Sequence, residues 1–353
     1  MTRVGGPGSQ LLAEIREQPA ALLRLLDHER EFAAVARRMR DNRPGAVRLV
    51  GHGSSDNAAS YGVYAFGLLP GWTALRDSIS LSVYYGAELD LARSCVVALS
   101  QSGRTPDVVE YAQKARRQGA LTVALTNDAG SALAEACELV LPLGAGTEHA
   151  VAATKTYTTQ VAALALLAGC AAGEGPRLAA GIRRTAELME ELLPGLEARV
   201  SELAMALAFI GRMFVIGRGP EYATAREISL KLLETCRVAA EPLTTTDLSH
   251  GPVAALDGLF PVWAIASDVA GLAAVREAAA HVRKAGATLI ASGTAAAEIP
   301  EAAYTLAVPA PPIALLAPLL SVVPGQMLAW ALAQAKGLDA DRPAGLSKVT
   351  LAS

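Results

Sequence analysis

The sequence predicts an α/β fold that is built twice. Short runs rich in β-branched residues, such as 95–100, alternate with stretches of helical periodicity that end at a glycine, such as 108–118 before Gly119. Because the apolar strands are continuous and separated by helices, they indicate parallel sheets with helices on both faces. The same pattern recurs 166 residues later, from Gly51 to Gly217, which indicates a tandem duplication.

Each half contains three predicted strands. They cover residues 48–53, 95–100 and 121–126 in the first half, and 213–219, 262–267 and 288–292 in the second. From Ser100 to Ser267 the offset is 167 residues, but the loop 267–271 lacks the hydroxyl-rich sequence of its counterpart, so we expect no phosphate site there. The predicted domains are an N-terminal helical lead-in (1–44), a first α/β domain (45–176), a second α/β domain (177–336) and a C-terminal tail (337–353).

The composition favours a large folded core and excludes two classes of partner. The chain has 353 residues, of which 52% are hydrophobic and 18% charged. A net charge of −3 without clustered positive residues argues against nucleic-acid binding. Apolar stretches such as 313–323 are interrupted by proline and fall short of the ~20 residues that a membrane span requires. Since residues 1–7 contain no apolar signal core, we expect a cytoplasmic protein without a membrane partner.

The four cysteines predict core packing. They all lie within apolar stretches and lack the spacing of metal ligands. We therefore expect reduced thiols, and we expect neither a metal nor a cofactor.

The run Ser-Gln-Ser-Gly-Arg-Thr at 100–105 predicts an anion site. It follows an apolar strand and precedes a helical pattern, so three hydroxyls, one amide and free backbone N–H groups can converge on one anion. The P-loop consensus is absent, which argues against a nucleotide. In parallel sheets ligands bind beyond the carboxyl ends of strands, where the loop 51–55 also lies.

Six stretches in order carry a resemblance to a known family across nearly the whole chain. They are 53–55, 100–105, 151–155, 227–234, 247–252 and 346–350. The chain resembles the tandem sugar isomerase (SIS) domain family, which includes the isomerase half of glucosamine-fructose-6-phosphate aminotransferase and stand-alone glucosamine-6-phosphate deaminases. The resemblance implies two flavodoxin-like domains, a phosphorylated sugar as ligand and a homodimer whose active site is completed across subunits.

The resemblance assigns four catalytic residues. Glu234 corresponds to the carboxylate that moves a proton between C1 and C2, and it shares a helical face with Lys231, a cation suited to a developing enediolate. His250 corresponds to the histidine that opens the sugar ring, a task that suits its near-neutral titration. Lys348 corresponds to the tail lysine that forms a Schiff base with the ketose or pairs with sugar oxygens.

The remaining predicted site residues bind substrate. The resemblance assigns this role to Ser54, Ser55, Ser100, Gln101, Ser102, Thr105, Val151, Ala153 and Glu227. Ala153 departs from the pattern, because the aminotransferase has a serine there, so one hydroxyl contact is lost.

The start of the sequence bears on the expected reaction. About forty residues precede the first predicted strand, too few for a glutaminase domain, so we expect no glutamine-dependent step. The favoured reaction is conversion of glucosamine 6-phosphate to fructose 6-phosphate and ammonia. Alternatives are another phosphosugar isomerase, a galactosamine-6-phosphate deaminase, a fructosamine-6-phosphate deglycase and, from another class, a non-catalytic sugar-phosphate sensor.

Overall fold

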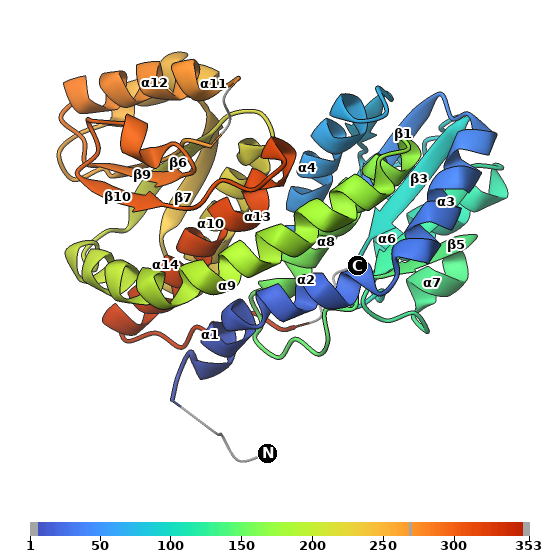
Figure 1. Ribbon diagram of the computed structural model, residues 1–353, viewed down its shortest axis with the longest axis horizontal. Helices are drawn as coiled ribbons and strands as arrows, with labels where there is room; N and C mark the ends of the chain where they lie inside the picture. The colour runs from blue at the N-terminus through green and yellow to red at the C-terminus, as the bar shows by residue number, and fades with distance from the viewer. Residues whose placement is uncertain (1–5, 268–269, 349–353) are drawn as a thin grey trace. The chain divides into compact units, whose positions relative to one another are not determined.

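The computed structural model describes residues 6–267 and 270–348, and contains two parallel five-stranded sheets (Figure 1). The strand order is β2-β1-β3-β4-β5 in the first sheet and β7-β6-β8-β9-β10 in the second, so corresponding strands occupy corresponding places. This is the flavodoxin-like order 2-1-3-4-5. The predicted α/β fold and its duplication are therefore confirmed.

The described residues form two compact units. The N-terminal unit comprises 20–148 and 155–183 together with the tail from 347, and the C-terminal unit comprises 149–154 and 184–346 together with the segment up to Pro19. The family-based boundaries at residues 44, 176 and 336 stay a prediction, and the compact units differ from them because the lead-in and the tail each divide between the two units.

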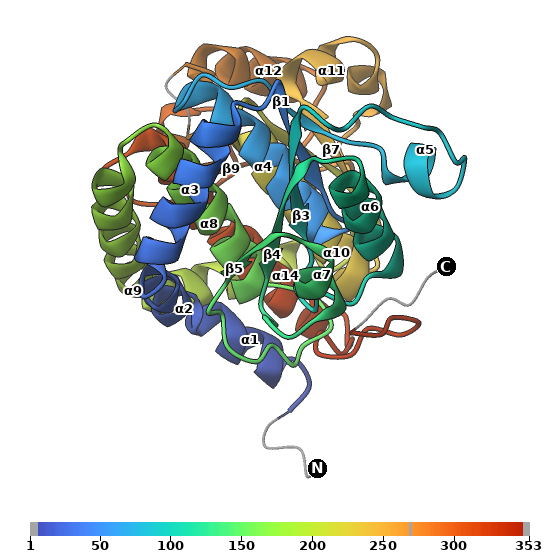
Figure 2. The same cartoon turned by 90° about the vertical axis from the view of Figure 1, so that its right-hand side faces the viewer.

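Helices cover both faces of the first sheet. Its strands are β1 (Ala46–Val50), β2 (Ala74–Arg76), β3 (Ser94–Leu99), β4 (Leu121–Thr126) and β5 (Leu139–Pro142). Figure 2 shows α3, α4 and α8 on one face and α5, α6 and α7 on the other. The helices from the N-terminus to this point are α1 (Ser9–Arg16), α2 (Gln18–Leu26), α3 (Glu29–Asn42), α4 (Ser54–Leu68), α5 (Ile79–Val83), α6 (Pro106–Arg117), α7 (Ala132–Ala136) and α8 (Lys155–Ala171).

The second sheet repeats this layering. Its strands are β6 (Arg212–Gly217), β7 (Ala239–Thr244), β8 (Val262–Ile265), β9 (Leu289–Gly293) and β10 (Tyr304–Ala307). In Figure 1, α11 and α12 lie on one face and α10, α13 and α14 on the other. The helices are α9 (Gly175–Ala206), α10 (Glu221–Cys236), α11 (Thr245–Ser249), α12 (Leu272–Lys284), α13 (Ala317–Ser321) and α14 (Val323–Ala335), with 3₁₀ turns η1 (Pro252–Ala255), η2 (Ala296–Glu298) and η3 (Ala314–Leu316).

Pairing registers show the duplication at residue level. Val50 pairs with Ala98 in the first sheet and Ile216 with Ala264 in the second, so both strands are offset by 166. One sequence interpretation is wrong here. The pairing of β6 with β8 keeps the offset at 166, so it places Ala266, not Ser267, at the position of Ser100. The extra residue that makes the offset 167 lies after β8.

The strands that the sequence did not predict are the four at the sheet edges. β2 has three residues and β5 has four, and β5 and β7 contain Pro142 and Pro242. Proline cannot donate to a strand ladder, so it is tolerated mainly at edges. These strands are also half-exposed, which removes the continuous apolar pattern that identified the central strands.

One expectation about apolar stretches needs correction. Residues 314–335 form a run of 22 residues that is long and apolar enough to cross a membrane. The expectation that the apolar stretches are too short for a membrane span is therefore wrong for this run. In the structure this run is η3, α13 and α14, and 89% of its most apolar window is buried in the protein. Core packing therefore accounts for its hydrophobicity.

Candidate active site

The predicted anion loop lies where β3 meets α6. Ser100 is 4% exposed, and its Oγ lies 3.1 Å from Thr105 Oγ1 and accepts a hydrogen bond from Gly103 N at the same distance. Ser102 Oγ accepts from Arg104 N at 3.3 Å. These contacts hold the loop in one conformation ahead of the α6 N-terminus, where backbone N–H groups favour an anion.

Gly103 is closely packed and has a left-handed backbone conformation. Its φ is +63°, and a Cβ built there would lie 2.0 Å from Ser131 Oγ. Gly103→Ala therefore combines left-handed strain of about 1–2 kcal/mol with overpacking of about 1–3 kcal/mol. We expect a clear loss of stability in urea unfolding and loss of phosphosugar binding in calorimetry.

Gly119→Ala is the matched control for this variant. Gly119 has φ +85° but nothing within 4 Å of its would-be Cβ, so only the backbone strain applies. Equal losses of stability and binding in the two variants would show that the close approach to Ser131 plays no part.

The second predicted loop lies at the start of α4. Gly53 has φ +55° and precedes Ser54, the first residue of the helix. Ser55 is 8% exposed, and its Oγ accepts from Gln160 Nε2 at 3.0 Å. Ser54 and Ser55 therefore lie at a helix N-terminus in the same unit as the Ser100 loop.

A cleft of about 740 Å³ opens beside the anion loop within the N-terminal unit. Its floor includes the loop 144–148, which Arg24 holds through hydrogen bonds to Gly144 O (2.8 Å) and Ala145 O (2.9 Å). The lining comprises Arg24, Gln101, Ser102, Arg104, Asn127, Asp128, Gly144, Gly146, Thr147 and Glu148. The lining thus carries two guanidinium groups and two carboxylates, and Arg104 is paired with Asp128 at 3.5 Å.

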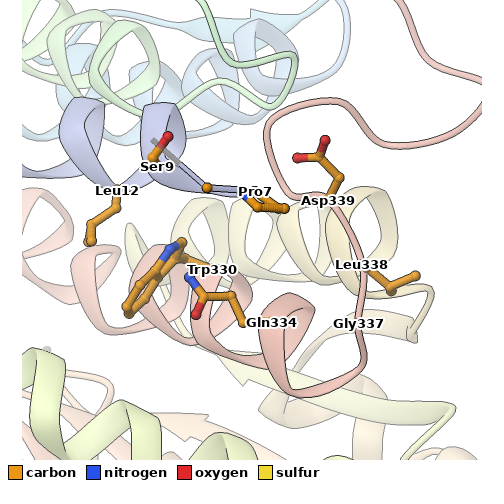
Figure 3. Close-up of a pocket in the computed structure, with 9 residues that line it drawn as sticks. Pro7, Ser9, Leu12, Trp330, Gln334, Gly337, Leu338 and Asp339 are labelled. Atoms are coloured by element: carbon orange, nitrogen blue, oxygen red, sulfur yellow. The ribbon is translucent and has the colours of Figure 1, made fainter. Parts of the chain in front are cut away.

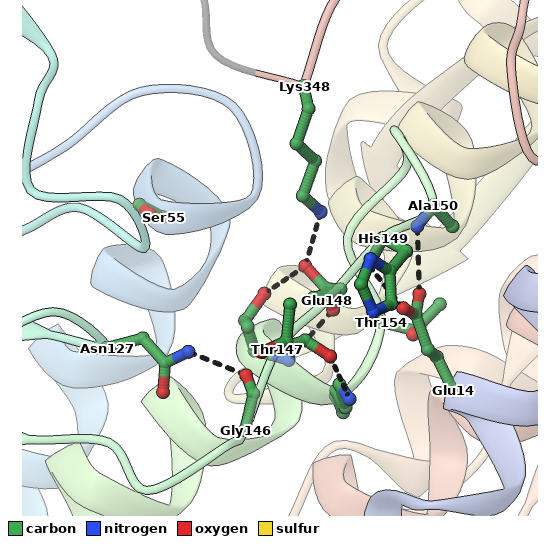
Figure 4. A network of polar contacts seen from close by, with 12 residues as sticks. Glu14, Ser55, Asn127, Gly146, Thr147, Glu148, His149, Ala150, Thr154 and Lys348 are labelled. Atoms are coloured by element: carbon green, nitrogen blue, oxygen red, sulfur yellow. Dashed lines mark hydrogen bonds and ion pairs between the residues drawn. The ribbon is translucent and has the colours of Figure 1, made fainter. Parts of the chain in front are cut away.

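Lys348 reaches this region through Glu148 (Figure 4). Its Nζ lies 2.7 Å from Glu148 Oε2, and the Glu148 side chain is fully buried. Thr156 donates to the same carboxylate from its N (3.2 Å) and its Oγ1 (2.8 Å). Through this ion pair the tail lysine contacts Glu148, which lines the same cleft as Gln101 and Ser102.

Glu148→Gln tests this anchor. The amide that replaces the carboxylate presents an N–H group to one of the present donors, which therefore loses its acceptor. We expect the free energy of unfolding, measured in urea, to fall by about 1–3 kcal/mol. In a double-mutant cycle with Lys348→Met, the coupling should be about 0.5–3 kcal/mol. Glu138→Gln, which removes an exposed partner of Arg38, is the control and should leave stability near that of the wild type. Strict additivity of Glu148→Gln and Lys348→Met would contradict the anchoring role.

In the C-terminal unit, α10 places two carboxylates around one ammonium. Lys231 Nζ lies 2.5 Å from Glu234 Oε2 and 3.5 Å from Glu227 Oε1. The Glu227 and Lys231 side chains are 0% and 2% exposed, whereas that of Glu234 is 23% exposed. Of these three groups, Glu234 is therefore the one that a substrate can reach.

The other predicted residues of this unit lie in loops. His250 is exposed and follows α11, where its N donates to Asp247 O at 3.1 Å. Val151 N donates to Asp341 O at 3.0 Å, and the preceding amides of His149 and Ala150 donate to Glu14 of α1. These bonds fix the backbone just ahead of Ala153.

A second cavity, of about 580 Å³, lies between α1 and α14 (Figure 3). Its described lining includes Ser9, Leu12, Trp330, Gln334 and Asp339 but no lysine or arginine. Because its described lining carries no cation, this cavity is a poor match for a phosphorylated sugar. None of the predicted site residues lines it.

The cysteines behave as core residues. Cys95, Cys137, Cys170 and Cys236 are free and buried. Burial raises the pKa of Cys95 and Cys137 to about 12 and that of Cys170 and Cys236 to about 11. At neutral pH these thiols are protonated and therefore poor nucleophiles.

A family model described as the SIS domain matches residues 44–169 and 206–335, so it matches once in each half. The chain belongs to the SIS domain family. The glutamine-fructose-6-phosphate aminotransferase of Thermus thermophilus is 33% identical over 98% of this chain. The alignment covers 59% of that relative, so the chain spans little more than half the length of the aminotransferases it matches.

Solved SIS structures share the fold. A Silicibacter pomeroyi protein provisionally assigned as a phosphosugar isomerase has 35% identity and a TM-score of 0.84, covering 94% of this chain and 99% of its own. Glucosamine-6-phosphate deaminase from Thermotoga maritima has 21% identity and a TM-score of 0.77, covering 98% of this chain and 100% of its own. At that identity the second likeness concerns the fold alone.

The structure distributes the predicted site residues of this SIS protein between its two units. The N-terminal unit contains the hydroxyl loops and Lys348, and the C-terminal unit contains the Glu227, Lys231 and Glu234 cluster together with Val151, Ala153 and His250. The sequence analysis missed Glu148, Arg24 and Asn127. The Gly-Ala-Gly sequence of 144–146 was the available signal, because it indicates a backbone that can approach a ligand closely.

Proposed function

We propose that this protein interconverts an aldose and a ketose phosphate, with glucosamine 6-phosphate as substrate and fructose 6-phosphate and ammonia as products. The observation that carries this proposal is the arrangement on α10. A partly exposed carboxylate, Glu234, lies 2.5 Å from the ammonium of Lys231, and the buried Glu227 carboxylate lies 3.5 Å from the same ammonium. A base and a cation at this separation suit proton abstraction next to a carbonyl or imine.

The reaction follows from these groups in three steps. His250 transfers a proton between the ring oxygen and O1, which opens the sugar to its aldehyde. Glu234 removes the C2 hydrogen as a proton and returns it to C1, while O1 gains a proton and the C2 nitrogen loses one, so the aldehyde and C2 amine become a C1 alcohol and a C2 imine. Lys231 is 2% exposed, so in this proposal its positive charge acts on the developing negative charge from behind Glu234, which it contacts at 2.5 Å. Water then adds to the imine, and the C2–N bond breaks to give the ketone and ammonia.

The phosphate group belongs in the N-terminal unit under this proposal. Ser54, Ser55, Ser100, Gln101, Ser102 and Thr105 bind it, with support from two helix N-termini and from Arg24 and Arg104 of the cleft. Lys348, anchored by Glu148, then meets the sugar oxygens or the ketose carbonyl. Borohydride in the presence of fructose 6-phosphate distinguishes these two roles, because only a Schiff base is trapped as a stable adduct.

Two comparisons support a phosphosugar substrate. The Thermus relative acts on fructose 6-phosphate and matches over almost all of this chain, and the Silicibacter protein at 35% identity is assigned to phosphosugars. We further propose a homodimer in which a second subunit completes the site around the exposed His250. We propose that the enzyme works in the cytoplasm, where its phosphorylated substrates are found.

A substrate panel tests the proposal. Purified protein is incubated with glucosamine 6-phosphate, galactosamine 6-phosphate, a fructosamine 6-phosphate adduct and glucose 6-phosphate, and ammonia and ketose are measured separately. We expect ammonia and fructose 6-phosphate in equal amounts from the first compound. Ketose without ammonia would favour a simple isomerase, turnover of the adduct a deglycase, and binding without any turnover a sensor.

A further inference from the structure

A histidine that the proposed reaction does not use lies between the two predicted phosphate loops. His52 follows β1, and its carbonyl oxygen accepts hydrogen bonds from Ser55 N at 3.0 Å and from Asp56 N at 3.4 Å, at the start of α4. Its Nε2 lies 2.5 Å from Asp107 Oδ2, which belongs to the first turn of α6 and comes two residues after Thr105. His52 therefore connects the loop that leads to Ser55 with the loop that ends at Thr105.

This pair spans the crevice in which parallel sheets of this kind bind their ligands. β1 and β3 are neighbours in the order β2-β1-β3-β4-β5, and the helices that follow them, α4 and α6, lie on opposite faces of the sheet. Ligands bind beyond the carboxyl ends of the strands at such a switch point. His52 comes from the β1 side of the crevice and Asp107 from the β3 side. The 740 Å³ cleft is lined, apart from Arg24, by residues that follow β3, β4 and β5, so His52 lies on the other flank of the anion loop.

One nitrogen of the His52 ring remains available to a ligand. Nε2 meets Asp107, and Nδ1 makes no hydrogen bond within residues 6–267 and 270–348. The His52 side chain is 54% exposed, whereas that of Asp107 is 9% exposed. Because the carboxylate can only accept, Nε2 carries a proton. Nδ1 is therefore the ring atom that a molecule from solution can reach.

The Asp107 carboxylate is occupied by donors, which leaves it suited to orient the imidazole. Besides His52, Tyr84 Oη donates to Oδ2 at 3.3 Å, and Val108 N donates to Oδ1 at 2.9 Å. The charge of Asp107 raises the pKa of Tyr84, so the phenol keeps its proton at neutral pH and stays a donor. A carboxylate that binds one ring nitrogen fixes which nitrogen faces the ligand.

We propose that His52 is a further phosphate-binding residue, which contacts a phosphate oxygen through Nδ1, and that Asp107 is its positioning residue. A phosphate oxygen can only accept, so the ring that donates to it is an imidazolium placed between two anions. Such charge-assisted hydrogen bonds are stronger than those of the neutral hydroxyls in the two loops. The inference rests on the phosphate position of the proposed function, but it requires no turnover.

Equilibrium dialysis with radiolabelled inorganic phosphate and with labelled fructose 6-phosphate tests the proposal. We expect His52→Asn to weaken both ligands by at least about tenfold, because they share the phosphate group. His28→Asn is the matched control, since His28 Nδ1 lies 3.6 Å from Glu31 Oε1 but far along the chain from the phosphate loops, and it should bind as the wild type does. Wild-type affinity in His52→Asn while Ser100→Ala binds weakly would overturn the proposal and leave the phosphate site in place. Loss of fructose 6-phosphate binding alone would also overturn it.

A double variant separates direct contact from mere screening of Asp107. Asp107→Asn removes the negative charge but keeps an oxygen that accepts from Nε2. If His52 contacts phosphate, His52→Asn should still weaken phosphate binding in the Asp107→Asn background. If His52 only covers the carboxylate, His52→Asn should have no effect in that background, and this result would overturn the proposal.

Discussion

Glu234→Gln is expected to lower turnover of the phosphosugar by about 10²–10⁴-fold while leaving its affinity nearly unchanged. The amide keeps the size of the side chain but cannot accept the C2 hydrogen as a proton. Because Glu234 is the partly exposed member of the α10 cluster, the substitution leaves the buried contact between Lys231 and Glu227 in place. The measurement is kcat from the ammonia and ketose assays, combined with a calorimetric Kd.

The control for this variant is Glu190→Gln, at an exposed position of α9. It should match the wild type in both kcat and Kd. Turnover by Glu234→Gln within a few-fold of the wild type would remove Glu234 from the catalytic role, and loss of binding together with turnover would point to a structural role instead.

Lys231→Met is expected to be the most destabilising of the substitutions considered. It takes away the ammonium beside Glu227, whose carboxylate is 0% exposed and cannot turn to solvent. Breaking a buried ion pair by removing one partner costs about 3–5 kcal/mol. Urea unfolding should show this as a lower midpoint with an unchanged slope.

A double variant provides the sharper control. Lys231→Met combined with Glu227→Leu removes the buried charge along with its partner, so it should recover part of the lost stability. Arg184→Met, which removes an exposed pairing with Glu187 on α9, should unfold near the wild-type midpoint. A similar small change in Lys231→Met and Arg184→Met would contradict a buried electrostatic cluster.

The central strands were predictable from sequence because their burial is complete. β3 and β4 are buried at every residue, which produces the continuous apolar runs that identify parallel strands. The edge strands β5 and β7 are only partly buried and include proline, so no comparable pattern marks them. The one-residue error at Ser267 has a related cause, because the sequence of a loop does not fix the register in which the neighbouring strands pair.

The candidate site was predictable to the extent that its residues belong to contiguous motifs. Lys231 and Glu234 are close because a helix places positions three apart on one face. The pairing of Glu148 with Lys348 joins residues 200 positions apart, and only the folded chain brings them together.

Loss of the C2 hydrogen from a hexosamine phosphate is the most direct measure of the proposed chemistry. Glucosamine 6-phosphate labelled with deuterium at C2 is incubated with the wild type and with Glu234→Gln, and the label is followed by NMR. The account predicts that deuterium leaves C2 with the wild type, at a rate that falls by about 10²–10⁴-fold in the variant. Retention of the label at C2 with the wild-type protein, while the sugar phosphate is bound, would contradict it.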